Sequence, residues 1–375
     1  MNIVFVIDTY NESSGGSVAT KRLVTELKKR GHNIKVVAAI HENESDPDFY
    51  EVPRFTIPIR RNIQSQMKFY FGKNKKSVFY KAMKDSDLVQ IQFPFLMAKG
   101  AAKMAKELNI PVIGSFHLQP QNILLALHSK NKNYEKLIWW LFKYFLFNRV
   151  NHVVAPSTFA SNLLAFNGVK ADITTISNGI TNEYTHQKLK KPDWFMNHFV
   201  ILSVGRHANE KKHNLIIEAI KKSNYASDIQ LILAGKGELS HDLKQLGNSL
   251  PIKPVIEYIS SEEKILFMNT SDIYIHASDI ELESLSTAEA IGCGLPSLIS
   301  NSIHSAASQF SLDDRFLFNA NDVNDLAQKI NYWYENRLEL NSDEIRDKAR
   351  SVANNYLIKD SIDKYENLYK QLTKI

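Results

Sequence analysis

A strand, a loop and a helix follow one another in residues 273–296, which read IYIHASDIELESLSTAEAIGCGLP. The apolar run Ile273–His276 has the length of a buried strand, and the residues after Ser284 are typical of a helix that ends at the glycines before Pro296. A second short apolar run, Ser297–Ile299, follows at once. Because this order predicts two parallel neighbouring strands, the stretch predicts an α/β fold.

The same alternation runs along the whole chain and predicts two consecutive doubly wound, Rossmann-like halves. In the first half we expect strands at Ile3–Ile7, Ile34–Ala38, Leu88–Gln92, Val112–Ser115, Val153–Ala155 and Ile173–Ile176. In the second half we expect them at Val200–Val204, Gln230–Ala234, Val255–Tyr258, Ile273–His276, Ser297–Ile299 and Phe316–Phe318. Helices are expected between them, for example at Ser17–Arg30, Lys212–Lys221 and Ser284–Gly292.

The length also indicates two domains. The chain has 375 residues, whereas single hydrophobic cores stop growing at roughly 250–300 residues. A polar stretch without periodicity, Thr181–Trp194, marks the boundary, so we expect domains at 1–182 and 183–358. The last helix, in 359–375, is amphipathic and is expected to pack back on the first domain.

The composition is that of a soluble globular chain, with 44% hydrophobic and 23% charged residues. No run of 18 apolar residues occurs, so we expect no membrane-spanning helix. The single cysteine, Cys293, excludes an intramolecular disulfide and a cysteine-cluster metal site, and favours a reducing compartment. The apolar start at Met1 lacks a basic segment, which predicts a strand rather than a secretion signal, and a cytoplasmic protein.

Positive charge is concentrated in the first half of the chain. Residues 1–190 contain 26 Lys and Arg against 14 Asp and Glu, whereas residues 191–375 contain 20 against 26. The segment Arg60–Lys84 carries many of these bases, no acid, and aromatic residues between the bases. Such a segment can bind an anionic membrane surface, where each base is worth about 1 kcal/mol. A solvated loop and helix face is the alternative, and we expect no nucleic-acid partner.

Two carboxylates, Glu281 and Glu289, are the most specific feature of the opening stretch. If the helix begins near Ser284, Glu289 lies in its second turn and Glu281 on the loop before it, so both can border one pocket. The N–H groups of Leu285 and Ser286 have no partner within the helix and favour a phosphate there without a metal. The alternative is a capped helix whose dipole favours surface acids.

Two bases follow the predicted strand Val200–Val204. After Gly205 come Arg206 and, five residues on, Lys211, which a parallel sheet places at its carboxyl edge. Arginine binds a diphosphate through its fork and lysine as a point charge, so the pair favours a diphosphate ligand. Ordinary surface bases after a strand are the alternative.

The first half has two further features of interest. The loop Asp8–Ser17 consists largely of small residues, among them Gly16, and lacks the spacing of GxGxxG and of a P-loop. It predicts either a close backbone approach to a ligand or a flexible turn. His117 follows the strand Val112–Ser115, where a doubly wound domain has its site residues, although a satisfied loop histidine is the alternative.

The motifs that are missing or unsuitable exclude several kinds of enzyme mechanism. HExxH, GxSxG and CxxC are missing from the sequence, which removes the commonest hydrolase and redox mechanisms. Asp85-Ser86-Asp87 matches a D-x-D metal pattern but leads directly into a strand, so we expect no metal. Residues Leu137–Phe147 are apolar apart from Lys143 and too short to span a bilayer; they predict a core helix or a helix that contacts a membrane.

In this order the motifs resemble the family 4 retaining glycosyltransferases of the GT-B fold, over nearly the whole chain. The order is the glycine loop, the strand followed by His117, Gly-Arg-x(4)-Lys from Gly205, Gly-Lys-Gly at 235–237, and Glu-x(7)-Glu from Glu281 followed by Gly-Leu-Pro. The stretches that resemble the bacterial diacylglycerol glucosyltransferase group in particular are Phe116–Asn122, Glu281–Ser284 and Ser305–Phe310.

The resemblance implies two Rossmann-like domains that face each other across a cleft, and a nucleotide-sugar co-substrate, commonly UDP-glucose, in place of a cofactor. It implies that Arg206 and Lys211 bind the diphosphate, Glu289 the ribose and Glu281 the donor sugar, while Ile259 lies near the base. Gly16 and His117 match residues that close over the diphosphate and sugar. The catalytic residues are then His117, Arg206, Lys211 and Glu281, and the donor-binding residues Gly16, Gly205, Arg206, Lys211, Ile259, Glu281, Ser284, Leu285, Ser286 and Glu289.

One departure from the family pattern concerns the phosphate site. Leu282-Glu283-Ser284 stands where Gly-Phe-Gly is usual, so that either Glu283 points away or the pocket differs. The expected function is metal-independent transfer of a hexosyl group from a UDP-sugar to a lipid such as diacylglycerol, by a peripheral protein on the inner face of the plasma membrane. Alternatives are transfer to a cell-surface polysaccharide or a protein, a sugar-nucleotide epimerase or hydrolase, and a non-catalytic partner subunit.

Overall fold

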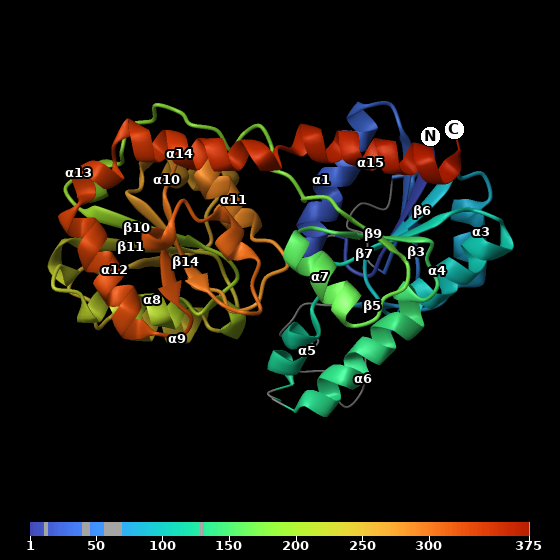
Figure 1. Ribbon diagram of the computed structural model, residues 1–375, viewed down its shortest axis with the longest axis horizontal. Helices are drawn as coiled ribbons and strands as arrows, with labels where there is room; N and C mark the ends of the chain where they lie inside the picture. Colours follow the sequence, from blue (N-terminus) through green and yellow to red (C-terminus); the bar gives the residue numbers. More distant parts are fainter. Residues whose placement is uncertain (11–13, 40–45, 56–69, 128, 130, 375) are drawn as a thin grey trace. The chain divides into compact units, whose positions relative to one another are not determined.

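The computed structural model describes residues 1–10, 14–39, 46–55, 70–127, 129 and 131–374. The chain forms two compact units: unit 1 comprises Met1–Asn178 and Lys359–Ile375, and unit 2 comprises Gly179–Ile358 (Figure 1). The boundary therefore follows residue 178 rather than 182. Residues 179–182 lie with unit 2 because Ile180 pairs with Leu357 in a strand-like bridge and its N–H donates to Tyr356 O at 2.7 Å.

Unit 1 contains a seven-stranded parallel sheet in the order β3-β2-β1-β6-β7-β8-β9. Its strands are β1 (Asn2–Ile7), β2 (Asn33–Ala38), β3 (Phe49–Glu51), β6 (Leu88–Ile91), β7 (Val112–Ser115), β8 (His152–Ala155) and β9 (Asp172–Thr175). Its helices are α1 (Gly15–Lys29), α3 (Lys76–Met83), α4 (Leu96–Glu107), α5 (Pro120–Ala126), α6 (Lys132–Phe142) and α7 (Thr158–Phe166). The central strands β1, β6 and β7 are almost wholly buried, as expected when helices cover both faces of a parallel sheet.

The six strands expected in this half are present, but three short ones were missed. These are the edge strand β3 and the antiparallel pair β4 (Arg54–Phe55) and β5 (Phe71–Gly72). Two or three residues are too few to show an alternating pattern, so hydrophobic periodicity carries no signal for them.

Unit 2 contains a six-stranded parallel sheet in the order β12-β11-β10-β13-β14-β15. Its strands are β10 (Phe199–Val204), β11 (Ile229–Ala234), β12 (Val255–Glu257), β13 (Ile273–His276), β14 (Ser297–Asn301) and β15 (Leu317–Asn319). Its helices are α8 (His213–Lys222), α9 (Ser240–Gly247), α10 (Ser261–Thr270), α11 (Leu285–Gly292), α12 (Val323–Glu335), α13 (Arg337–Leu340) and α14 (Asp343–Ala353). Every strand predicted for this half is present, and both sheets confirm the doubly wound α/β prediction.

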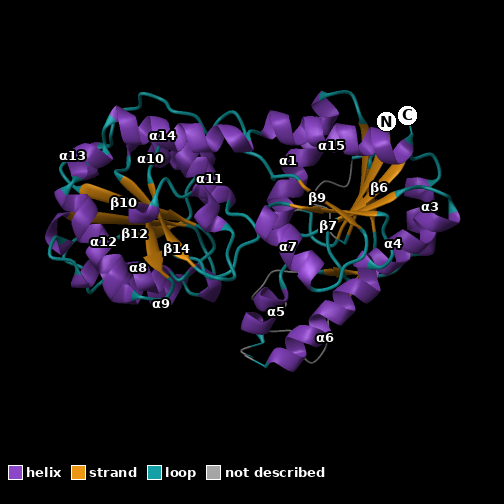
Figure 2. Cartoon of the chain, viewed as in Figure 1, coloured by secondary structure: helices purple, strands orange, loops and turns teal. Residues whose placement is uncertain are grey.

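The last helix, α15 (Ile358–Thr373), belongs to unit 1 from Lys359 onward. Arg30 and His32, just after α1, contact Glu366 at 2.9 Å each, and the Tyr369 hydroxyl donates to Gln90 in β6. Tyr369 is fully buried. This end of the chain therefore completes the first unit, as its amphipathic pattern predicts (Figure 2).

The apolar stretch Leu137–Phe147 forms the end of α6 and a π-helical turn, Lys143–Phe147. One face, with Ile138, Trp139, Phe142, Leu146 and Phe147, is buried in unit 1. The other face leaves Leu137 and Trp140 more than half exposed. Within the part of the chain that the structure describes, none of the helices has the length and apolar character needed to span a bilayer.

Candidate active site

The predicted residues of unit 2 lie at the carboxyl edge of its sheet, where the strand order reverses between β10 and β13. Gly205 and Arg206 directly follow β10, and the loop that carries Glu281 follows β13. Gly235, after β11, must lack a side chain, because a β-carbon there would lie 1.9 Å from Gly205 O. The loops after β10 and β11 are thus held in close contact at the reversal, which is where doubly wound sheets bind ligands.

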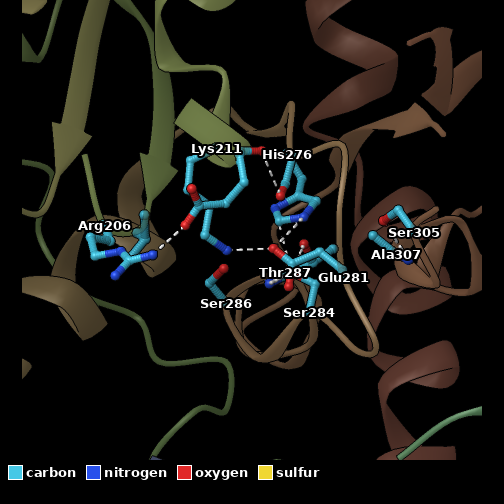
Figure 3. A network of polar contacts seen from close by, with 12 residues as sticks. Arg206, Lys211, His276, Glu281, Ser284, Ser286, Thr287, Ser305 and Ala307 are labelled. Atoms are coloured by element: carbon cyan, nitrogen blue, oxygen red, sulfur yellow. Dashed lines mark hydrogen bonds and ion pairs between the residues drawn. The ribbon is translucent and has the colours of Figure 1, made fainter. Parts of the chain in front are cut away.

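Lys211, His276 and Glu281 form the centre of this site. Lys211 Nζ donates to Glu281 Oε1, and His276 Nε2 lies 3.5 Å from the same oxygen (Figure 3). Burial would raise the pKa of Glu281, but the charge of Lys211 and the contact with His276 outweigh it and lower this pKa to about 2. Glu281 is therefore an anion at neutral pH, and it holds the ammonium of Lys211 at the sheet edge.

The backbone of Glu281 is fixed by the loop after β14. Its N–H donates to His304 O at 3.2 Å, and its carbonyl oxygen accepts from Ala306 N at 2.9 Å. Figure 3 shows Ser305 beside the Glu281 loop. The Ser305–Phe310 motif that the sequence singled out thus supports the loop that presents the carboxylate.

Arg206 lies on the other side of Lys211. Its guanidinium donates to Glu210 Oε1 at 2.5 Å. The segment then turns into α8 through Lys212, whose φ of 52° is left-handed and whose Nζ lies 3.3 Å from Asp279. Two cations, Arg206 and Lys211, are therefore carried on one short loop, and ion pairs hold both.

Helix α11 begins beside this pair of cations. Ser284 is its N-cap, and its hydroxyl accepts from Thr287 N. The Ser286 hydroxyl accepts from Tyr274 at 2.9 Å. Burial is the main reason why the pKa of Tyr274 is raised, and the charges of Glu289 and Glu281 add to it. The structure thus brings Arg206, Lys211, Glu281, Ser284 and Ser286 close together, with Leu285 as the first residue of α11. Their roles in donor binding stay a prediction.

Glu289 is the exception to that cluster. Its Oε2 lies 2.5 Å from Lys264 Nζ on α10, and its side chain is only 2% exposed. Each of the two predicted carboxylates therefore has a lysine of its own, Lys211 for Glu281 and Lys264 for Glu289.

The two remaining predicted features of unit 2 concern Glu283 and Ile259. Only 8% of Glu283 is exposed. The pKa of Tyr356 is raised mainly by the burial of Tyr356, and the charge of Glu283 raises it further. The extra carboxylate thus lies close enough to Tyr356 to act on it. Ile259 follows β12 and packs, partly buried, against the core. The role of Ile259 beside a nucleotide base stays a prediction.

In unit 1 the structure brings Gly16 and His117 together. A β-carbon on Gly16 would lie 2.9 Å from His117 Cβ and 2.8 Å from Phe93 Cζ. His117 Nε2 lies 2.8 Å from Gln92 Oε1, an acceptor, so Nε2 carries the hydrogen. Burial lowers the pKa of His117 to about 4, so its ring is neutral at pH 7. Residues 11–13 of the loop lie outside the described residues.

The D-x-D pattern at 85–87, from which we expect no metal, has a structural role. Asp87 Oδ2 accepts from Asn2 N at 2.7 Å and so ties the start of β1 to the turn before β6. Across residues 1–10, 14–39, 46–55, 70–127, 129 and 131–374, no group of three or more His, Cys, Asp or Glu could hold a metal ion.

Sequence reasoning missed three residues of the site: Tyr274, His276 and Lys264. Tyr274 and His276 alternate with isoleucines in β13, and periodicity treats them as part of a buried strand. Their position at the carboxyl end of that strand is the signal that could have found His276. Lys264 lies in a helix whose pattern gives no sign that it faces Glu289.

The fold is that of the GT-B glycosyltransferases, and the chain belongs to the family 4 glycosyltransferases. Two family models match it in succession: Glycosyltransferase Family 4 over residues 13–184 and Glycosyl transferases group 1 over residues 185–352. Together they span nearly all of the chain. The resemblance drawn from the motifs is thereby confirmed.

Individual relatives share much of this chain at modest identity. Alpha-monoglucosyldiacylglycerol synthase of Streptococcus pneumoniae is 25% identical over 79% of this chain and 70% of its own length. The synthase of the same name from Acholeplasma laidlawii is 24% identical over 76% of each chain. A GDP-mannose-dependent alpha-mannosyltransferase of Corynebacterium glutamicum is 21% identical over 80% of this chain and 72% of its own.

Solved structures show the same fold. Anabaena HepE in complex with UDP-glucose superposes with a TM-score of 0.76 at 15% identity, over 99% of this chain and 100% of that one. Sucrose-phosphate synthase from Thermosynechococcus elongatus gives 0.78 at 16% identity, over 99% and 98%. At such identities the likeness establishes the two Rossmann-like sheets of the GT-B fold and nothing more specific.

Proposed function

We propose that this glycosyltransferase moves glucose from UDP-glucose to a lipid acceptor such as diacylglycerol, at the cytoplasmic face of the membrane. The observation that carries the proposal is the pairing of Lys211 with Glu281 beside Arg206 and the start of α11. This arrangement suits a diphosphate joined to a sugar. The monoglucosyldiacylglycerol synthases among the relatives, and the UDP-glucose bound by HepE, support the choice of acceptor and donor.

The cations would act on the leaving group. When the anomeric C–O bond breaks, positive charge develops on the sugar and negative charge on the departing diphosphate. Arg206 and Lys211 are already held at the sheet edge by their carboxylates, so little reorganisation is needed to meet that charge. Loss of one such donor typically costs about 2.7–4 kcal/mol of transition-state stabilisation.

The sugar would be held by neutral and anionic groups. Glu281 is ionised and can accept hydrogen bonds from sugar hydroxyls, while Glu289 is assigned to the ribose and His117 to the transferred sugar. Attack from the face that the diphosphate leaves, with a phosphate oxygen taking the acceptor's proton, would retain the anomeric configuration without a dedicated base. Excess chelator is expected to leave the rate unchanged, and a loss that added metal restores would contradict a metal-independent mechanism.

The described part of the basic segment carries the proposed membrane contact. Residues 60–69 lie outside the described residues. Lys73, Lys75 and Lys76 are described and exposed, while Phe79 of the same segment is buried. Helix α3 therefore packs its apolar face into unit 1 and leaves its lysines exposed to solvent. Each exposed base near an anionic surface contributes about 1 kcal/mol, and partly exposed Leu137 and Trp140 could add apolar contact.

A charge-reversal variant tests this contact. Lys73→Glu, Lys75→Glu and Lys76→Glu together are expected to reduce binding to phosphatidylglycerol vesicles at least tenfold, measured by co-sedimentation, without changing the affinity for UDP. Unchanged sedimentation would show that these bases form an ordinary solvated face.

The proposed reaction is tested by UDP release from a panel of UDP-sugars, with and without vesicles that contain diacylglycerol, and by the masses of the products. Release that requires one sugar and diacylglycerol, with a hexosyl-lipid product, is the expected result. Donor binding without lipid-dependent release would shift the acceptor to a polysaccharide or protein. UDP release without any glycosylated product would indicate hydrolysis, and binding without turnover a non-catalytic subunit.

A further inference from the structure

A lysine that the sequence reasoning did not single out holds the second carboxylate of the Glu-x(7)-Glu motif. Lys264 Nζ, on α10, lies 2.5 Å from Glu289 Oε2, on α11. The Glu289 side chain is 2% exposed and the Lys264 side chain 19%. The pair therefore lies almost wholly inside unit 2, where an ion pair has fixed geometry rather than the mobility of a surface contact.

Tyr184 is the third member of this arrangement. Lys264 Nζ donates to the Tyr184 hydroxyl at 3.1 Å, and Tyr184 is only 6% exposed. The backbone of Tyr184 lies directly on α11, since a β-carbon on Gly292 would lie 2.6 Å from Tyr184 O. Three separate segments of unit 2 thus fix the position of the Lys264 ammonium.

The charges show which cation neutralises Glu289. Burial alone would lower the pKa of Lys264, but the charge of Glu289 and the contacts with Tyr184 raise it, so Lys264 is cationic at neutral pH. The other lysine near the motif, Lys211, contacts Glu281 instead. Because burying a carboxylate without a cation is costly, Lys264 supplies a counter-charge for the buried Glu289 side chain.

We propose that Lys264 is a positioning residue that fixes the Glu289 carboxylate for the ribose hydroxyls of the donor, and so sets the preference of the enzyme for ribonucleotides over 2′-deoxyribonucleotides. The inference rests on the proposed function, in which Glu289 binds ribose. A carboxylate that is held in place by a buried lysine accepts hydrogen bonds with defined geometry. A ligand that lacks the 2′-hydroxyl leaves that buried acceptor less well satisfied, which is how polar sites discriminate strongly between analogues.

The experiment compares the dissociation constants of UDP and 2′-deoxy-UDP by calorimetry on the full chain. The wild type is expected to prefer UDP at least tenfold. Lys264→Met should weaken UDP binding about tenfold, leave 2′-deoxy-UDP binding nearly unchanged, and so reduce the preference below threefold. Lys264→Arg, which keeps the charge, should retain most of it. Lys348→Met is the matched control, because it removes a lysine that pairs with Asp313 elsewhere in unit 2.

A double variant separates positioning from general damage to the fold. If Lys264 acts through Glu289, Lys264→Met should not change the UDP preference further in the Glu289→Gln background. The double variant also removes both buried charges, so it leaves no uncompensated one and provides a folded comparison if Lys264→Met alone is unstable. An added loss of preference in that background would overturn the proposal.

Two outcomes distinguish this inference from the proposed function. If Glu289→Gln abolishes the preference while Lys264→Met keeps it, Lys264 does not position the carboxylate, and the ribose role of Glu289 stands. If Glu289→Gln keeps the full preference, Glu289 does not bind the ribose, and this part of the proposed function fails together with the inference.

Discussion

The two units present different chemistry at the carboxyl edges of their sheets. In unit 2 the edge is charged, and each of Arg206, Lys211 and Lys264 contacts a carboxylate. In unit 1 the contact between Gly16 and His117 contains no ion pair, and His117 is neutral because burial lowers its pKa to about 4. Nearly the same strand order therefore supports ion pairs at the edge of one unit and an uncharged contact between Gly16 and His117 at the edge of the other.

Under the proposed function, the two edges would meet different needs of the reaction. A diphosphate leaving group needs fixed cations, because its charge grows as the bond breaks. A sugar hydroxyl needs hydrogen bonds and a close fit, for which a neutral imidazole and a glycine are suited. Substitutions at the charged edge should thus change the rate of transfer by removing charge, and substitutions at the uncharged edge by changing the shape of the site.

The largest expected effect belongs to the charged edge. Lys211→Ala removes a cation proposed to stabilise the leaving diphosphate, so kcat for glucosyl transfer should fall about 100-fold, equivalent to about 2.7 kcal/mol. Initial rates of UDP release at saturating donor measure it, with Lys348→Ala as the control from another ion pair of unit 2. A rate within threefold of the wild type would remove Lys211 from the reaction and with it the contrast between the two edges.

The second prediction concerns the neutral state of His117. Its pKa is about 4 in the folded protein and 6.5 in a model peptide, so below pH 6.5 the unfolded chain binds more protons and stability falls as the pH falls. Between pH 7 and 4.5 the wild type should lose about 2 kcal/mol more stability than His117→Gln, from urea unfolding curves. Glu281 does not affect this comparison. Its pKa is lowered to about 2, so its contribution to the stability of the fold is lost mainly below pH 4.5.

The opposite result would also be informative. Equal losses of stability in the wild type and His117→Gln would mean that His117 ionises with an ordinary pKa. The edge of unit 1 would then carry a charge in mild acid and would resemble that of unit 2.

The strands were predictable from sequence because they are buried on both faces. Runs such as Ile229–Ala234 and Phe199–Val204 are apolar apart from Gln230 and Ser203, which is close to what a covered parallel sheet requires. The pair β4 and β5 has two residues in each strand and depends on contacts between segments distant in sequence. No local pattern could therefore reveal it.

The site was predictable where its residues lie on one loop and less so where elements meet. Arg206 and Lys211 share the loop after β10, and their place follows from the direction of that strand. The contact of Glu289 with Lys264 joins two helices, and only the packing of α10 against α11 decides it. The sequence likewise left the environment of Glu283 open, because burial beside Tyr356 depends on the end of α14.

The smallest expected effect comes from the uncharged edge. Gly16→Ala adds a β-carbon that would lie 2.9 Å from His117 Cβ and 2.8 Å from Phe93 Cζ, so the His117 loop must shift by a few tenths of an ångström. A displacement of that size in a group proposed to contact the sugar should lower kcat about tenfold, since orientation errors are costly in catalysis. The rate is again measured as UDP release with donor and diacylglycerol.

If the loss of rate in Gly16→Ala is caused by shape rather than charge, giving the new methyl group more space should restore part of the rate. Phe93→Leu removes the ring atom that the new methyl group would meet, so the double variant Gly16→Ala with Phe93→Leu should recover part of the rate, relative to Phe93→Leu alone. Affinity for UDP should stay unchanged throughout, because the diphosphate is assigned to Arg206 and Lys211. A drop in UDP affinity as large as the drop in rate would show that the uncharged edge also binds the diphosphate, and the division of labour between the two units would not hold.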